Sequence, residues 1–152
     1  MSEVVNLFDA PRARDDDDPA GYEVPYARIG PLVGAANLGL SIYELAAGQS
    51  ICPYHYENAE EEWLIVLAGR PTLRTPSGER ELEAWDCAFF PTGEEGAHKV
   101  TNRTEEIARV CIWSNRFAVA TSVYPDSEKV GAWPPGKLFR LADAVEYFTG
   151  EA

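Results

Sequence analysis

The most informative segment of the chain reads Cys52-Pro-Tyr-His55-Tyr-Glu57-Asn-Ala-Glu60-Glu61-Glu62-Trp-Leu-Ile-Val-Leu-Ala-Gly69. Residues two apart on a strand face the same side, so His55 and Glu57 are expected to point in one direction. A continuous apolar run then follows Glu62 and ends before Gly69, which is typical of a buried strand. If that strand returns beside the first one, Glu62 faces the same side as His55 and Glu57.

Short predicted strands with frequent turns surround this segment, and residues 38–115 show no helical period. The turn Pro76-Ser77-Gly78 would join two of the strands as a hairpin. Many short strands linked by glycine and proline turns predict an all-β closed barrel or jelly roll. The predicted strands cover residues 38–45, 51–57, 62–67, 72–75, 79–82, 87–90, 97–102 and 108–114.

The two ends of the chain differ from this pattern. Residues 1–31 form a predicted acidic N-terminal arm with four consecutive aspartates, in which residues 24–29 could add an edge strand. We expect the barrel over residues 32–118, and a loop followed by a C-terminal helix packing on the barrel over residues 119–152. The apolar residues at helical spacing that predict this helix are Leu138, Leu141, Ala142, Val145 and Phe148.

Composition excludes several classes of function. A length of 152 residues favours one domain, and a net charge of −12 disfavours binding to nucleic acid or to anionic membranes. No apolar run is long enough to span a bilayer, and no leader sequence is recognisable, so we expect a cytoplasmic protein. Three cysteines are an odd number, which favours reduced thiols over a disulfide framework.

The chain contains two histidines, His55 and His98, and the second opens a distant predicted strand. If the sheet closes, His98 can meet the side chains of His55, Glu57 and Glu62 inside the barrel. Imidazoles and carboxylates held on rigid strands are typical metal ligands. The alternative interpretation is two ordinary core histidines beside a solvated acidic turn.

These residues resemble the two sequence motifs of the cupin superfamily, a small jelly-roll barrel also described as a double-stranded β-helix. The first motif runs from Gly48 through His55-Tyr56-Glu57 and Glu62 to Gly69, and the second runs from Trp85 through Pro91-Thr92-Gly93 and His98 to Asn102. The chain departs from the family pattern in three ways. Glu57 stands where the second histidine is usual, Trp85 replaces a glycine, and the loop before His98 is two residues longer.

The resemblance implies a metal site with the ligands His55, Glu57, Glu62 and His98. Two imidazoles and two carboxylates suit one divalent zinc, iron or manganese ion. If Glu57 turns away, the remaining three ligands resemble the two-histidine, one-carboxylate arrangement of oxygen-activating iron. Spacing to Gly69 favours Glu62 as the carboxylate ligand, and Glu61 is the alternative.

The resemblance also implies a function. We expect a metal-dependent enzyme, such as a dioxygenase or isomerase, that acts on a small molecule by Lewis-acid or oxygen chemistry, with Glu57 and Glu62 as the catalytic carboxylates. An inward Arg74 would select an anionic substrate. The alternative is a barrel that binds a small ligand or is purely structural. The candidate substrate-binding residues on the predicted strands are Tyr43, Arg74, Phe89 and Trp113.

The apolar strand has two hydrophobic faces. If Glu62 points into the barrel, then Trp63, Ile65 and Leu67 point outward, and this outer face must also be buried. A second sheet, the C-terminal helix or a second subunit could cover it. Because many proteins of the family that the chain resembles are dimers, the resemblance implies a homodimer.

Overall fold

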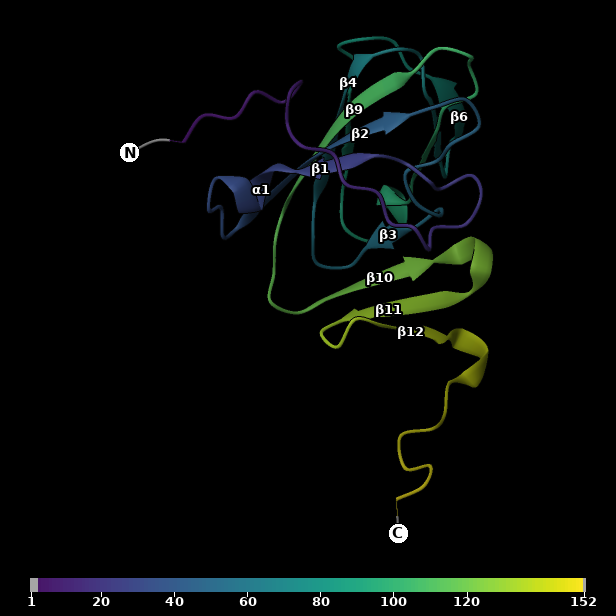
Figure 1. Ribbon diagram of the computed structural model, residues 1–152. Coiled ribbons are helices and arrows are strands. Elements are labelled where there is room, and N and C mark those ends of the chain that lie inside the picture. The colour runs from purple at the N-terminus through teal and green to yellow at the C-terminus, as the bar shows by residue number, and fades with distance from the viewer. Residues whose placement is uncertain (1–2, 152) are drawn as a thin grey trace.

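The computed structural model describes residues 3–151, so the first two residues of the predicted arm and the last residue of the chain lie outside the described range. The chain forms three antiparallel sheets (Figure 1). Their strand orders are β1-β2-β9-β4-β7, β12-β11-β10-β3 and β6-β5-β8. The strands are β1 (Tyr26–Arg28), β2 (Leu38–Leu45), β3 (Tyr56–Glu57), β4 (Glu62–Ala68), β5 (Thr72–Thr75), β6 (Gly78–Glu81), β7 (Cys87–Phe90), β8 (Lys99–Thr101), β9 (Ala108–Asn115), β10 (Ala120–Tyr124), β11 (Lys129–Trp133) and β12 (Lys137–Arg140).

Helices are short in this protein. They are α1 (Ile29–Leu32) and the 3-10 turns η1 (Glu94–Gly96), η2 (Pro125–Ser127) and η3 (Leu141–Asp143). None of the helices found in residues 3–151 has the length and apolar character needed to cross a membrane.

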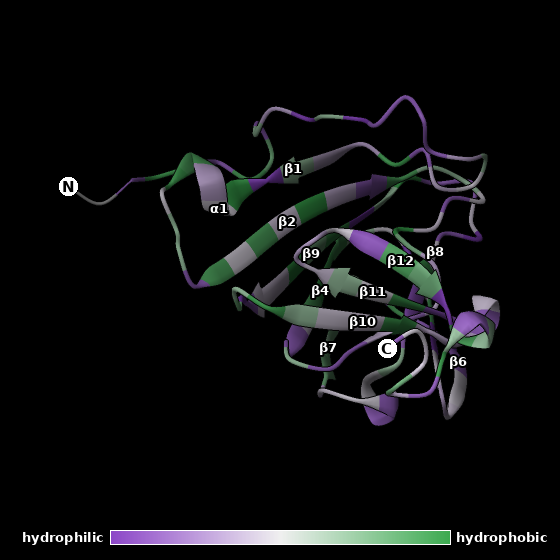
Figure 2. Ribbon diagram, turned by 90° about the horizontal axis from the view of Figure 1, so that it is seen from below, coloured by the Kyte–Doolittle hydropathy of each residue, from purple (hydrophilic) through white to green (hydrophobic). Residues whose placement is uncertain are grey.

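The main hydrophobic core lies between the five-stranded and three-stranded sheets. In the pairing of β4 with β9, Leu64 lies opposite Ile112 and Val66 lies opposite Val110. Cross-strand partners face the same side of a sheet, so alternate residues of both strands meet inside the barrel. Figure 2 shows hydrophobic and polar residues alternating along β2, whose residues Leu40 and Ile42 pack in a second cluster on the other face of the sheet. The buried core members include Leu45, Leu64, Val66, Leu73, Phe90, Val100 and Val110.

The all-β barrel predicted from the sequence is confirmed, and β2, β5 and β7 have the predicted bounds. The predicted strand over residues 51–57 is shorter than expected. It contributes β3 and one isolated bridge, which pairs His55 with His98, while the preceding residue Ser50 forms a second bridge with Thr101. Pro53 interrupts the segment because proline has no backbone N–H to donate to a ladder.

The N-terminal arm covers part of the outer face of the five-stranded sheet. β1 is an edge strand that pairs with β2, and Ala13 bridges to Tyr26. A second apolar cluster forms where Ala10 of the arm packs with Ile42 and Cys111, with Val5 and Leu7 beside them. The arm therefore supplies some of the covering that the outward residues of the apolar strand require.

An aromatic cluster remains partly exposed on the same outer face. The rings of Trp63 and Trp113 stack at 5.9 Å, and Phe89 lies 4.9 Å from Trp63. Trp63 is 39% exposed and Phe89 is 43% exposed. The arm thus leaves an aromatic surface that it does not cover.

The predicted C-terminal helix is wrong. Residues 120–140 form β10, β11 and β12, and η3 follows. β10 pairs with β3, which attaches this sheet to the barrel, and the chain beyond η3 extends away from it (Figure 1). A short helix needs a packed apolar face, and no such packing is present because the apolar residues at helical spacing are exposed. The exposed residues include Leu138, Leu141, Val145 and Phe148.

Asn102 joins three backbone segments and is fully buried. Its Nδ2 donates to the carbonyls of Leu45 and Glu106 at 2.8 and 2.7 Å, and its Oδ1 accepts from Thr104. We expect Asn102→Ala to lower the free energy of unfolding by about 2–4 kcal/mol, because the buried carbonyl of Leu45 loses its donor and the hydrogen bond to the carbonyl of Glu106 is also lost. Urea denaturation measures this change.

Asn58→Ala is the matched control, because Asn58 makes one exposed hydrogen bond to Thr121. It should cost less than about 1 kcal/mol. Equal losses in the two variants would contradict the structural role of Asn102.

Candidate metal centre

The two histidines face each other across an isolated antiparallel bridge. The backbone N–H of His55 donates to the carbonyl of His98 at 3.1 Å, and the N–H of His98 donates to the carbonyl of His55 at 2.8 Å. Directly paired residues place their side chains on the same side. The two imidazole centroids are accordingly 4.7 Å apart, and both residues are buried.

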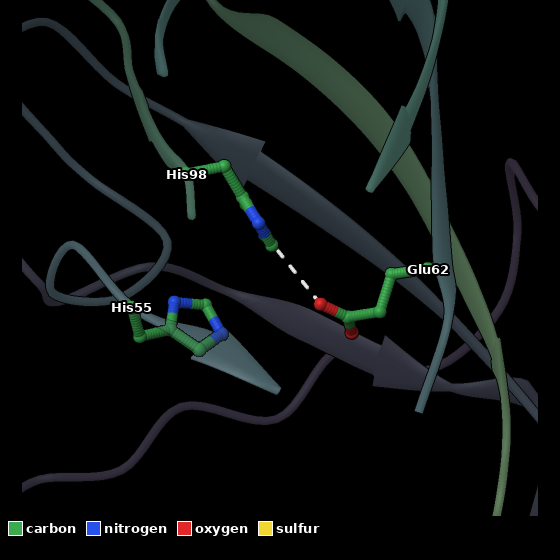
Figure 3. Close-up of side chains that lie close together, drawn as sticks. All are labelled: His55, Glu62 and His98. Carbon is green, nitrogen blue, oxygen red and sulfur yellow. Dashed lines mark ion pairs between the residues drawn. The ribbon is translucent and has the colours of Figure 1, made fainter. Parts of the chain in front are cut away.

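Glu62 reaches the same place from β4. It lies two residues before the buried Leu64, so both point into the barrel, whereas Glu61 is exposed. The Oε2 atom of Glu62 is 3.5 Å from Nε2 of His98. One ligand atom from each of His55, Glu62 and His98 lies within 4.8 Å of the other two. Figure 3 shows these three side chains converging.

Backbone carbonyls hold both imidazoles in one orientation. Nδ1 of His55 lies 3.0 Å from the carbonyl oxygen of Pro53, and Nδ1 of His98 lies 2.9 Å from that of Gly96. A carbonyl oxygen only accepts, so each Nδ1 carries the hydrogen. The neutral ring then has a free lone pair on Nε2. This second hydrogen bond is the arrangement that orients metal-binding histidines in proteins.

The electrostatics of the cluster favour neutral imidazoles. Burial lowers the pKa of His98 to about 3, and the neighbouring His55 contributes to this shift. Burial also lowers the pKa of His55. Burial raises the pKa of Glu62 to about 7, with the charges of Glu57 and Glu60 adding to the effect. Two lone pairs and a buried carboxyl group therefore converge, and a divalent cation would stabilise them with the carboxylate ionised.

Glu57 lies beside this cluster but is held by a different partner. Its Oε1 is 3.6 Å from Nε2 of His55, and both carboxylate oxygens are 2.8 Å from the hydroxyl of Ser122. Trp133 donates its indole N–H to the same hydroxyl at 3.0 Å. Burial raises the pKa of Glu57, and the hydrogen bond from Ser122 opposes that rise.

Ser122 and Trp133 were not identified from the sequence. They belong to β10 and β11, the strands that replace the predicted C-terminal loop and helix. Ser122 is placed by the pairing of β10 with β3, in which it lies directly opposite Glu57. Tyr124 of β10 also reaches the site, because its ring stacks on His55 at 5.8 Å. Nothing in the local sequence signals these contacts.

Tyr43 is the one predicted substrate-binding residue that lies near the cluster. It lines a cavity of about 380 Å³ together with Glu62. Burial raises the pKa of its phenol to about 12, so the hydroxyl stays protonated and can donate a hydrogen bond. Two arginines that were not singled out from the sequence, Arg28 and Arg116, line the same cavity.

The structure places Arg74, Phe89 and Trp113 away from the cluster. Arg74 forms two hydrogen bonds with Asp126, at 2.6 and 2.9 Å, and lies over the ring of Tyr54, so its charge is already paired. Phe89 lies opposite Trp63, which in turn lies opposite Trp113. All three aromatic residues face outward because they alternate with the inward residues of their strands.

The cysteines show no sign of an activated thiol. Sγ of Cys52 lies 3.5 Å from Nδ1 of His55. Burial raises the pKa of Cys52 to about 12 and that of Cys111 to about 11. A nucleophilic cysteine needs a lowered pKa, so neither thiol fits that role.

The raised pKa of Glu62 predicts a pH dependence of stability. In metal-free protein, the ionisation of Glu62 removes stability as pH rises from about 4.5 to about 7, because the folded-state pKa is the higher one. His98 acts in the opposite direction, because its pKa is lowered and stability falls as pH drops below about 6.5. The variant Glu62→Gln removes the first contribution and keeps the second.

The unfolding free energy of Glu62→Gln minus that of the unchanged protein should therefore increase by about 2 kcal/mol as pH rises from 5 to 8. Urea denaturation with a chelator present measures it. The exposed control Glu61→Gln should show no such difference. A pH-independent difference for Glu62→Gln would contradict the predicted ionisation.

Comparison with solved structures shows the same fold in proteins with different names. A cupin-superfamily sugar phosphate isomerase from Silicibacter pomeroyi has a TM-score of 0.83 at 22% identity, covering 95% of this chain and 96% of that chain. A provisionally assigned sugar phosphate isomerase from Acidithiobacillus ferrooxidans has a TM-score of 0.76 at 24% identity, covering 83% of this chain and 81% of that one. A polyketide cyclase from Streptomyces resistomycificus has a TM-score of 0.63 at 21% identity, covering 76% and 80%.

These identities establish a shared fold and leave the activity open. No curated protein sequence matches the chain. The family model for the cupin domain matches residues 41–115, which contain His55, Glu62 and His98. The sequence motifs, the barrel and this match agree, and the chain belongs to the cupin superfamily.

Proposed function

We propose that this protein binds one divalent metal ion through His55, Glu62 and His98 and acts as a metal-dependent enzyme on a small molecule. The observation that carries the proposal is the pair of Nε2 lone pairs that face a buried carboxylate. Each imidazole is fixed in the required tautomer by a carbonyl behind it. A structural core has no need for two oriented lone pairs beside an acid.

The donor set limits the metal. Two imidazole nitrogens and a carboxylate oxygen suit zinc, iron or manganese. Three protein ligands leave coordination positions for water or substrate, which is the arrangement of catalytic sites. Such an ion, when bound, polarises a carbonyl or lowers the pKa of a bound water.

The surrounding residues have separate roles in this proposal. Glu57 moves a proton to or from the substrate, because its carboxylate lies beside His55 and is held in place by Ser122. The alternative that Glu57 is a fourth ligand stays a prediction, and the metal content of Glu57→Gln separates the two. Tyr43 donates a hydrogen bond from its protonated phenol into the cavity.

Metal binding is tested first on protein purified without chelator and without a metal-binding tag. We expect about one equivalent of zinc, iron or manganese by elemental analysis, and at least tenfold weaker binding in Glu62→Gln and His98→Ala. Glu61→Gln is the matched control, because it removes an exposed carboxylate one residue away and should keep the metal.

Two results would overturn the proposal of a metal site. The first is far less than one equivalent in the unchanged protein after incubation with each of the three ions. The second is equal metal content in Glu62→Gln and Glu61→Gln. A loaded protein that turns over no substrate would instead favour the ligand-binding barrel.

Homodimer formation and a cytoplasmic location stay predictions. The partly exposed aromatic surface of Trp63 and Phe89 supports a dimer that buries it. Light scattering should then give twice the monomer mass of 16.8 kDa for the unchanged protein. Phe89→Asp should give the monomer mass, whereas Phe139→Asp, at an exposed position on β12, should stay dimeric.

A further inference from the structure

We infer that Arg28 and Arg116 form a subsite for an acidic group of the substrate, a phosphate or a carboxylate, at the mouth of the metal centre. The inference rests on the proposed function, because the metal centre defines the other end of the substrate. Both arginines line the 380 Å³ cavity that also contains Glu62.

Strand register places Arg28 on the same face of the sheet as Glu62. Arg28 pairs with Ser41, Ser41 pairs with Ile112, and Ile112 pairs with Leu64. Partners across neighbouring strands share a face, and Leu64 points into the barrel. Arg28 therefore belongs to the row of inward positions next to that of Glu62.

Arg116 lines the cavity from the residue that follows β9, whereas Arg28 belongs to β1. Its backbone N–H donates to the carbonyl of Asn37 at 2.9 Å, which extends the β2–β9 ladder by one pair. Ser114, two residues earlier, pairs with both Gly39 and Glu62. Residues two apart share a face, so Arg116 follows Ser114 on the side where Glu62 lies.

Gly39 lies between the two arginines and leaves the space that an acidic group would occupy. An added Cβ there would lie 3.2 Å from Oγ of Ser114 and 3.6 Å from Cδ of Arg116. Two strand spacings, about 10 Å, separate Gly39 from Glu62 across the sheet. A small molecule can therefore place an acidic group over Gly39 and its oxygen atoms at the metal centre.

The charges of the cavity support this assignment. The chain has a net charge of −12, and arginines such as Arg12, Arg74 and Arg109 pair with carboxylates. Within residues 3–151, neither Arg28 nor Arg116 makes an ion pair, and Arg28 instead lies 5.3 Å from the ring of Tyr26. Two free guanidiniums on one cavity of an acidic protein match a planar or tetrahedral oxyanion.

The cavity also contains two carboxylates. Glu62 is the proposed metal ligand, and Glu60 accepts a hydrogen bond from the N–H of Phe117 at 3.3 Å. With Glu62 neutralised by the metal, the arginines give the mouth a positive charge. The subsite therefore selects molecules by an acidic end, while the metal centre holds the reacting end.

The test uses protein loaded with Zn²⁺ and three 2-hydroxy acids titrated by calorimetry. All three present the same hydroxyl and carboxylate to the metal. They differ at the far end, which is a methyl group in 2-hydroxybutyrate, a carboxylate in malate and a phosphate in 3-phosphoglycerate. We expect the two acids with a charged end to bind more tightly, and the tighter of them identifies the group.

Arg28→Gln and Arg116→Gln should each weaken binding of the charged-end acids by about ten- to hundredfold and leave 2-hydroxybutyrate unchanged. Gly39→Val keeps both arginines and fills the space between them, so it should have the same effect. Arg80→Gln is the matched control, because Arg80 is exposed on β6 outside the cavity. It should bind all three acids as the unchanged protein does.

Equal affinity of the Arg28, Arg116 and Arg80 variants for 3-phosphoglycerate and malate would overturn the subsite. Failure of the metal proposal has a different signature. In that case no variant holds zinc, and inorganic phosphate still binds the metal-free protein in a way that depends on Arg28 and Arg116. If only the subsite is wrong, the variants hold zinc, and the loss of Arg28 or Arg116 does not change the binding of phosphate or of the charged-end acids.

Discussion

The reciprocal backbone hydrogen bonds between His55 and His98 are the constraint on which the candidate site depends. They join two segments that are far apart in the chain and point both imidazoles to the same side. The carbonyls of Pro53 and Gly96 then fix the tautomer of each ring, so that Nε2 is free on both, 3.5 Å from Glu62 in His98 and 3.6 Å from Glu57 in His55. A backbone pair is well suited to this task because its geometry leaves little freedom to the side chains beyond it.

The C-terminal sheet has a second role besides completing the fold. β10 pairs with β3 and brings the hydroxyl of Ser122 onto both oxygens of Glu57. A carboxylate held in this way keeps its position beside His55 even though burial raises its pKa. Glu57 therefore differs in surroundings from Glu62, which faces the histidines directly. Two carboxylates in different surroundings are suited to different tasks in one site.

Acidic and basic side chains also lie in different places around the cavity. The chain is strongly acidic, yet the cavity beside the metal centre is lined by two arginines without ion pairs in the described residues. The buried acids face inward, where the proposed cation would offset their charge, and the guanidiniums lie at the mouth, where an anion would do so. Under this proposal, the separation gives a small molecule one defined orientation in the barrel.

Much of this protein could be predicted from short-range patterns. Period-two alternation identified β2, a continuous apolar run identified β4, and the spacing of His55, Glu57, Glu62 and His98 indicated the cupin motifs. The spacing to Gly69 favoured Glu62 over Glu61, and the strand then places these neighbouring residues on opposite faces. By contrast, helical spacing over residues 138–148 was misleading, because those apolar side chains have no core to pack against.

What the sequence by itself determined is therefore most strands between residues 38 and 115 and the candidate ligand residues of that region. The tertiary structure alone decided which distant segments meet. It brought Ser122 to Glu57, placed Arg28 and Arg116 beside Glu62, and turned Arg74 toward Asp126. The physical reason is that local propensity depends on neighbours along the chain, whereas these contacts depend on the register of strands that pair only after the barrel has closed.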